Sequence, residues 1–166
     1  FRRVLFRSTP DPLQLNALIA QMVEEGCTHC FMEVSSHALV QKRVAGIKFS
    51  GGIFTNITHD HLDYHKSFNE YIKAKKIFFD SLGGNAFALV NVDDKNGAVM
   101  LQNTHAKKYT YSLKSMSDYK AKLIENHFSG LTLSIDGHEV TCRLVGAFNA
   151  YNLTAAYATA ILLGEE

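Results

Sequence analysis

The sequence of 166 residues has no long uninterrupted hydrophobic run. A membrane-spanning helix needs about 20 consecutive apolar residues, and the apolar runs here are short and interrupted by polar side chains. The amino-terminal segment FRRVLFRS also lacks the apolar centre and the small-residue cleavage site of a secretory signal. We therefore expect a protein without a membrane partner that works in the cytoplasm.

The sequence also has few cysteines and a small net charge. Three cysteines with a single CTHC segment, Cys27 to Cys30, form no obvious disulfide framework, and we expect free thiols in a reducing compartment. The formal net charge of +1 provides no electrostatic reason to expect nucleic acid as the main partner. With 46% hydrophobic and 20% charged residues, the chain can bury one core, so we expect a single soluble domain.

Segments with helical spacing of apolar residues alternate with short continuous apolar runs in the first part of the chain. In chain order, the pattern predicts a helix at 11–25, a strand at 28–34, a helix at 37–44, a strand at 52–57, a helix at 68–82 and a strand at 86–92. Asp93 and Asp94 can cap a weaker helix that follows. This alternation indicates an α/β fold with a mainly parallel sheet flanked by helices.

After residue 107 the pattern changes to short alternating strands. The predicted strands cover 108–113, 119–128, 131–135 and 139–144. Ser129-Gly130 and Asp136-Gly137 supply turns between them, so we expect a small antiparallel β extension. An Ala-rich helix follows at 149–163. Its predicted buried stripe consists of Leu153, Ala156, Tyr157, Ala160 and Ile161.

The phosphate loop GxxxxGK[ST] is absent, yet two segments carry the groups used in phosphate and metal chemistry. MEVSSHALVQKR begins at Met32 and FTNITHDHLDYH begins at Phe54, each at an apolar run. An open α/β sheet builds its active site at the carboxyl ends of its strands. Glu33 with Ser35 and Ser36 would gather a carboxylate and two hydroxyls there. That set suits either a magnesium ion beside a phosphate or a strand end with capping serines.

The second segment concentrates ionisable groups, namely His59, Asp60, His61, Asp63 and His65. Such groups repel or compete unless they are exposed or organised around a charge. The pattern HxHxDxH is similar to the HxHxDH zinc signature of metallo-β-lactamases, but Tyr64 separates the aspartate from the last histidine and changes the ligand geometry. A zinc-dependent hydrolase is therefore one hypothesis, and a noncatalytic binding module is another.

Four segments in order, the two above together with YIKAKKIFF and GAFNAYN, resemble the Mur ligase family. The MurE type matches most closely. Those ligases use ATP to add diaminopimelate or lysine, as the third residue, to UDP-N-acetylmuramoyl-L-Ala-D-Glu in peptidoglycan synthesis. The resemblance implies that residues 1–166 are part of the central ATP-binding domain of a longer, monomeric enzyme. It places the phosphate loop and two further domains outside these residues, so we expect no ligase turnover from the isolated chain.

The resemblance also implies a magnesium site beside ATP. Glu33 and His61 would bind Mg²⁺, and Lys75 would be carbamylated by carbon dioxide to give an anion near a second metal ion. Carbamylation requires the neutral amine, and we expect the neighbouring Lys73 and Lys76 to help disfavour the Lys75 cation.

Further residues are implied as contacts to the substrates. The residues that would contact the UDP-linked dipeptide are Ser8, Thr9, Ser35, Gln41 and Arg43. Arg43 offers the bidentate geometry that suits a carboxylate or phosphate. Asn149, in GAFNAYN, would lie near the nucleotide base. The implied reaction is attack by the dipeptide carboxylate on the γ-phosphate of ATP, which forms an acyl phosphate, followed by displacement of phosphate by the incoming amine.

Overall fold

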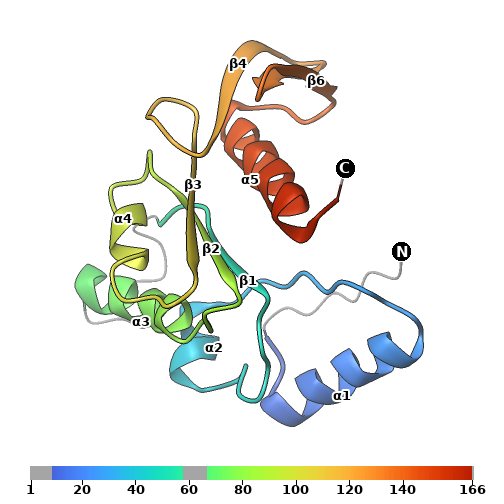
Figure 1. Ribbon diagram of the computed structural model, residues 1–166, viewed down its shortest axis with the longest axis vertical. Helices are drawn as coiled ribbons and strands as arrows, with labels where there is room; N and C mark the ends of the chain where they lie inside the picture. The colour runs from blue at the N-terminus through green and yellow to red at the C-terminus, as the bar shows by residue number, and fades with distance from the viewer. Residues whose placement is uncertain (1–8, 58–66, 166) are drawn as a thin grey trace. The chain divides into compact units, whose positions relative to one another are not determined.

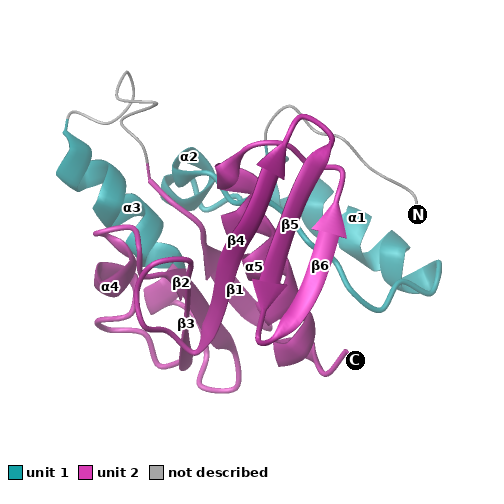
Figure 2. Ribbon diagram, turned by 90° about the horizontal axis from the view of Figure 1, so that it is seen from above, with its two compact units in different colours: residues 1–48, 61–78 teal, residues 49–60, 79–166 magenta. Residues whose placement is uncertain are grey.

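The structure, a computed structural model, describes residues 9–57 and 67–165. Within them the chain forms two compact units, which Figure 2 shows in different colours. Unit 1 comprises the described residues of 1–48 and 61–78, and unit 2 comprises those of 49–60 and 79–166. Unit 1 contains the helices α1, α2 and most of α3, whereas unit 2 contains the β-sheet with α4 and α5.

The helices of unit 1 begin where local signals place them. Helix α1 (Pro12–Glu24) follows Asp11, whose Oδ1 accepts hydrogen bonds from the backbone N–H groups of Leu13 (2.9 Å) and Gln14 (3.1 Å). Pro12 fits the first turn, where its missing N–H costs no hydrogen bond. Gly26, with φ of 82°, follows the end of the helix. Helices α2 (Ser36–Val40) and α3 (Phe68–Asp80) also lie within or close to their predicted ranges.

The predicted strand at 28–34 is wrong. These residues form neither helix nor strand, and Phe31 and Glu33 are exposed. A continuous apolar run becomes a buried strand only when neighbouring strands supply hydrogen bonds and cover both faces. Among residues 9–57 and 67–165, no strand pairs with this segment. Glu33 therefore lies in an irregular segment and not at the end of a strand.

Unit 2 is built on a six-stranded sheet with strands in sequence order (Figure 1). The strands are β1 (Gly51–Phe54), β2 (Phe87–Asn91), β3 (Lys107–Ser112), β4 (Tyr119–His127), β5 (Gly130–Ile135) and β6 (His138–Cys142). The pairs β1–β2, β2–β3 and β3–β4 are parallel, and the pairs β4–β5 and β5–β6 are antiparallel. The predicted fold class, a mainly parallel sheet with a small antiparallel extension, is confirmed.

The antiparallel extension begins later than predicted. Strand β3, which covers most of the predicted strand at 108–113, runs parallel to β2, with Leu89 opposite Tyr109. The sequence of β3, KKYTYS, alternates tyrosines with polar residues toward its end, as a half-exposed strand would, but its burial runs from an exposed start to a buried end. Alternation reports which side chains are covered, and it does not report the direction of the neighbouring strand.

Helices α4 (Gly97–Met100) and α5 (Ala147–Leu163) lie on opposite sides of the parallel strands in Figure 1. The side chains that α5 buries are Ala150, Thr154, Ala155, Ala158 and Thr159. The predicted stripe is wrong at Ala156, which is exposed, and at Ile161, which is 41% exposed. Its members Leu153 and Tyr157 do pack against a buried cluster of the sheet. Small side chains let the helix approach the sheet closely. The two buried hydroxyls donate to carbonyls one turn earlier, at 2.7 and 2.6 Å, so their burial leaves no unpaired hydroxyl hydrogen.

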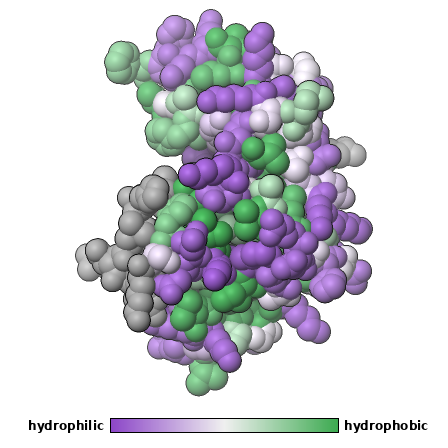
Figure 3. Space-filling model, turned by 90° about the vertical axis from the view of Figure 1, so that its left-hand side faces the viewer, coloured by the Kyte–Doolittle hydropathy of each residue, from purple (hydrophilic) through white to green (hydrophobic). Residues whose placement is uncertain are grey.

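The core of unit 2 forms where α5 covers the sheet. One buried cluster combines Phe87, Leu89 and Tyr111 with the small residues Ala155 and Ala158. On the face shown in Figure 3, hydrophobic and hydrophilic residues are interspersed. In the described part of the chain, no helix has both the length and the apolar character to cross a membrane.

Candidate functional site

Three of the predicted substrate-contact residues come together in unit 1. Arg43 donates from Nη1 to the backbone carbonyl of Thr9 (2.8 Å) and from Nε to Oε1 of Gln41 (2.8 Å). Thr9 is buried, so its carbonyl is a fixed anchor for the guanidinium. The guanidinium carries further N–H donors on Nη1 and Nη2, which could meet a carboxylate or phosphate in a planar, two-bond geometry. The arrangement thus forms a preorganised anion-binding group.

Ser35 has a structural role at the start of α2. Its Oγ accepts a hydrogen bond from the backbone N–H of Ala38 (3.2 Å), which is the usual N-cap contact. The hydroxyl hydrogen can still donate to a ligand. Its predicted contact with the substrate stays a prediction. Ser8 and His61 lie outside the described residues.

Lys75 and Glu33 interact electrostatically within unit 1. Lys75 is half-buried on α3, with its Nζ 5.3 Å from the centroid of the Tyr71 ring one turn earlier. Burial lowers the pKa of Lys75, and the negative charge of Glu33 raises it by a smaller amount. Burial is therefore the main cause of the low pKa, in place of the predicted effect of Lys73 and Lys76. The neutral amine that carbamylation needs is therefore more accessible at Lys75 than in an ordinary exposed lysine.

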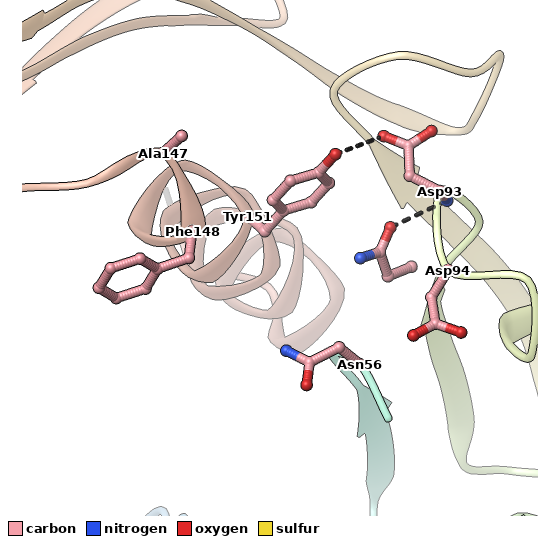
Figure 4. A pocket seen from close by; sticks show the side chains of 7 residues that line it. Asn56, Asp93, Asp94, Ala147, Phe148 and Tyr151 are labelled. Carbon is pink, nitrogen blue, oxygen red and sulfur yellow. Dashed lines mark hydrogen bonds between the residues drawn. The ribbon is translucent and has the colours of Figure 1, made fainter. Parts of the chain in front are cut away.

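Unit 2 contains a pocket of about 370 Å³ that the sequence did not reveal. It is lined by Asn56, Asn91, Asp93, Asp94, Ala147, Phe148 and Tyr151 (Figure 4). The pocket lies where β1 and β2 end and where α5 begins, which is the edge at which open α/β sheets bind ligands. A usable signal was present, because Asn56 and Asp93 each follow the last residue of a parallel strand by two positions.

Asp93 is the most heavily bonded group of this pocket. Its Oδ2 accepts from the backbone N–H groups of Leu113 (2.8 Å) and Lys114 (2.9 Å), and its Oδ1 accepts from that of Ser115 (2.9 Å). Tyr151 on α5 also donates its hydroxyl to Oδ2 (3.1 Å). Burial acts to raise the pKa of Asp93, but the hydrogen bonds from Ser115, Leu113 and Lys114 together hold the pKa far below its ordinary value. Asp93 is therefore an anion that links the end of β2 to α5.

Asp94 fixes the neighbouring strand. Its Oδ2 accepts from the backbone N–H of Ile57 (3.0 Å), just after β1, and its Oδ1 accepts from the backbone N–H of Asn96 (2.8 Å). The prediction that Asp93 and Asp94 cap the next helix is wrong, since Asn96 is the residue that precedes α4 and no side chain caps that helix. Gly97 then packs against the carbonyl of Asn91, where a Cβ would clash. These contacts hold the end of β1 against the end of β2.

Asn149, the predicted neighbour of the nucleotide base, lies in the first turn of α5 beside Phe148. Its Nδ2 donates to the carbonyl of Val145 (2.8 Å), and its Oδ1 accepts from Nδ2 of Asn152 (3.2 Å). Asn149 therefore belongs to the same helix start as the pocket residues Ala147, Phe148 and Tyr151.

Replacement of Asp93 by asparagine should lower the stability of the chain at neutral pH. An asparagine oxygen can accept fewer hydrogen bonds than the carboxylate, so we expect a loss of about 1–3 kcal/mol in the free energy of unfolding at pH 7. Because the folded-state pKa is depressed, the stabilisation by Asp93 is present above the unfolded pKa and is lost as the pH falls toward the folded pKa. The wild type should therefore lose more stability than the variant between about pH 5 and pH 2.

Urea unfolding at several pH values measures this effect. The matched control is Asp136→Asn, because Asp136 is exposed in a turn with φ of 47°, a conformation that asparagine tolerates. Equal acid sensitivity of the wild type and the Asp93→Asn variant would show that Asp93 is not a stabilising anion.

The predicted zinc cluster HDHLDYH lies outside the described residues. Elsewhere, across 9–57 and 67–165, no group of three or more His, Cys, Asp or Glu side chains could hold a metal ion. The sequence comparison covers this cluster as well. The family model of the Mur ligase middle domain matches residues 5–160. The chain belongs to the Mur ligase family. The zinc-hydrolase and binding-module hypotheses are replaced by this assignment.

Several curated relatives of the chain share one name. The chain is 64% identical over 159 residues to a UDP-N-acetylmuramoyl-L-alanyl-D-glutamate–2,6-diaminopimelate ligase of Cytophaga hutchinsonii, covering 96% of this chain and 33% of that protein. A protein of the same name from Bacteroides thetaiotaomicron is 57% identical with the same coverage. A solved structure of a ligase with this name superposes with a TM-score of 0.85 at 32% identity, over 95% of this chain and 34% of that one. The chain spans about a third of the length of its curated relatives.

Proposed function

We propose that this chain is the central part of a cytoplasmic, ATP-dependent ligase that adds 2,6-diaminopimelate to UDP-N-acetylmuramoyl-L-Ala-D-Glu. The observation that carries the proposal is the 64% identity, over 159 residues, to a diaminopimelate ligase. The match covers 96% of the chain and so includes both the Lys75 region and the pocket region.

The proposed reaction has two steps. The terminal carboxylate of the UDP-linked dipeptide attacks the γ-phosphorus of ATP, so that a new O–P bond forms while the bond to ADP breaks. The amine of diaminopimelate then attacks the resulting acyl phosphate, and phosphate leaves as the amide forms. Phosphoryl transfer depends mainly on positioning and on neutralisation of charge, so the task of the chain is to hold the reactants and counter their charge.

Glu33 and Lys75 are the residues that fit a magnesium site. Magnesium prefers oxygen ligands, and a carbamate on Lys75 would add oxygen atoms close to the carboxylate of Glu33. The burial that lowers the pKa of Lys75 favours the amine that reacts with carbon dioxide. Bound magnesium would neutralise charge on the phosphates of the nucleotide. Burial prepares Lys75 for this role before any ligand binds, and the charge of Glu33 acts in the opposite direction by a smaller amount.

The pocket of unit 2 suits the base and ribose of the nucleotide. Phe148 offers an exposed aromatic surface, 68% accessible, on which a base can stack, and Asn56 offers an exposed amide that can donate and accept. Asp93 and Asp94 contribute negative charge, which would repel phosphate oxygens and accept hydrogen bonds from amino or hydroxyl groups. We therefore propose that the base lies in this pocket, beside Asn149.

The guanidinium of Arg43 is the proposed contact for an anionic group of the dipeptide substrate. Its anchoring to Thr9 and Gln41 reduces the entropy lost when the substrate binds, since two of its N–H groups are already fixed. Ser35 and Ser8 would add hydroxyl contacts to the same substrate.

A chimeric ligase tests the proposed function. In the chimera, residues 5–160 of this chain replace the matching part of the Cytophaga hutchinsonii protein. Release of phosphate should depend on ATP, the UDP-linked dipeptide and diaminopimelate together, with kcat within about tenfold of that of the unmodified relative, given the similarity of the exchanged part. The isolated chain is the negative control, from which we expect no turnover.

Substitution of lysine for diaminopimelate tests the choice of amino acid in the same assay. A folded chimera that forms no amide, while the unmodified relative does, would contradict the proposal.

A further inference from the structure

Tyr151 joins the pocket of unit 2 to a rigid hydrogen-bond network. Its ring lines the pocket, and its hydroxyl donates to Asp93 Oδ2 at 3.1 Å (Figure 4). Burial, followed by the hydrogen bond to Asp93 and the charge of Asp93, raises the pKa of Tyr151 to about 12. The phenol is therefore neutral at physiological pH and acts as a permanent donor.

The acceptor of this hydrogen bond cannot move freely. Asp93 follows β2, and its carboxylate is held by three backbone N–H groups from Leu113 to Ser115, after β3. A carboxylate fixed from two strands of the sheet is a stable reference point. The hydrogen bond from Tyr151 therefore ties the beginning of α5 to the carboxyl ends of β2 and β3.

The beginning of α5 lacks a side-chain N-cap, so the hydrogen bond from Tyr151 is one of the contacts that hold it. The residue before the helix, Gly146, has no side chain that could cap it, and Phe148 in the first turn is largely exposed. The later part of α5 is held differently, because Ala155 and Ala158 pack in the core with Phe87 and Leu89. Ala150 in the first turn is also buried, so loss of the Tyr151 hydroxyl would leave the helix packed but would remove the bond that holds the pocket side of its first turn to Asp93.

We propose that Tyr151 is a positioning residue for the nucleotide, which acts by holding Phe148 and Asn149 opposite Asn56 through its hydrogen bond to Asp93. This inference rests on the proposed function, since it assigns the pocket to the base of ATP. Tyr151 does not take part in the transfer of the phosphoryl group. Its effect should appear in the affinity for ATP and not in kcat at saturating ATP.

The test is Tyr151→Phe in the chimeric ligase, because this change removes only the hydroxyl. We expect the dissociation constant of ATP, measured by isothermal titration calorimetry, and the KM for ATP to rise about tenfold, as expected for the loss of an ordering hydrogen bond to a charged group. The KM for the UDP-linked dipeptide and kcat at saturating ATP should stay within about twofold of the parent values, because neither depends on the base.

The matched control is Tyr157→Phe on the same helix. Tyr157 is half-buried, and its hydroxyl has no hydrogen bond to any residue in the described part of the chain. Removal of that hydroxyl should leave the ATP affinity unchanged. A double-mutant cycle with Asp93→Asn adds a second readout, since the two changes should be non-additive for ATP affinity if one hydrogen bond carries the effect.

The outcomes separate the inference from the proposed function. Unchanged ATP affinity in the Tyr151→Phe variant overturns the inference, as does an equal loss for Tyr157→Phe. A lower Tm with a lower kcat but an unchanged KM for ATP also overturns it, because that result describes a structural role alone. If the chimera binds ATP but forms no amide, the proposed function fails, while weaker ATP binding by the Tyr151→Phe variant still supports the inference.

Discussion

Replacement of Lys75 by alanine in the chimeric ligase is expected to lower kcat by about a thousandfold, the scale seen when a preorganised electrostatic group is removed from an active site. Lys75 is half-buried, has a lowered pKa and lies within the electrostatic field of Glu33. A simple surface lysine would show none of these features. The loss should appear in kcat with little change in the Tm, because the side chain has no hydrogen bond to a described residue that holds α3 together.

The chemical state of Lys75 can be measured directly. The neutral amine attacks carbon dioxide, a C–N bond forms, and one proton is released to leave the carbamate anion. ¹³C-bicarbonate should therefore produce a carbamate signal in the NMR spectrum of the wild-type chimera that disappears in the Lys75→Ala variant. Lys75→Arg should be as inactive as Lys75→Ala, because arginine keeps a positive charge and stays protonated.

Lys73→Ala is the matched control for Lys75. Lys73 lies on the same helix and is exposed, so its removal should change kcat by less than about twofold. Full activity of the Lys75→Ala variant, or retention of the carbamate signal in it, would contradict the assigned role.

Replacement of Arg43 by alanine should raise the KM for the UDP-linked dipeptide by about a hundredfold, as expected when a charged, bidentate contact to an anion is lost. Arg43→Lys should recover only part of the affinity, because an ammonium group cannot keep the bonds to Thr9 and Gln41 and also form two parallel bonds to a carboxylate or phosphate. The KM for ATP should be unaffected. Initial rates at varied dipeptide concentration measure all of these changes.

The exposed Lys48 provides a charge-matched control for Arg43. Lys48→Ala removes one positive charge from the same unit without touching the Arg43 cluster, so the KM for the dipeptide should stay within about twofold of the parent value. An equal effect of the two changes would show that overall charge, and not the geometry of Arg43, governs binding.

Elements with local signals were the ones that could be predicted correctly. Asp11 and Gly26 mark the ends of α1, because capping and a positive φ angle depend on residues a few positions apart. The direction of β3 was predicted incorrectly, and so were Ala156 and Ile161 in the buried stripe of α5. Both depend on partners that are distant in the chain, namely β2 and the sheet face that α5 covers.

The same distinction applies to the candidate site. Resemblance of motifs pointed to Glu33, Lys75, Arg43 and Asn149, and the structure places Arg43 against Thr9 and Gln41. The motifs did not reveal the pocket of unit 2, because the hydrogen bond between Tyr151 and Asp93 joins residues 58 positions apart. No motif spacing encodes that contact. Only the return of the chain along α5 brings the two side chains together.

By itself, the sequence determined the α/β class, the membership in the Mur ligase family and the identity of the charged groups, because periodicity and motifs depend on residues that are near one another in the chain. The tertiary structure alone decided that residues 28–34 form no strand, that burial controls the pKa of Lys75, and that Asp93 and Tyr151 build one wall of a pocket. The physical reason is that strand pairing, desolvation and pocket formation depend on atoms from distant segments, whose approach is specified by packing and not by local sequence.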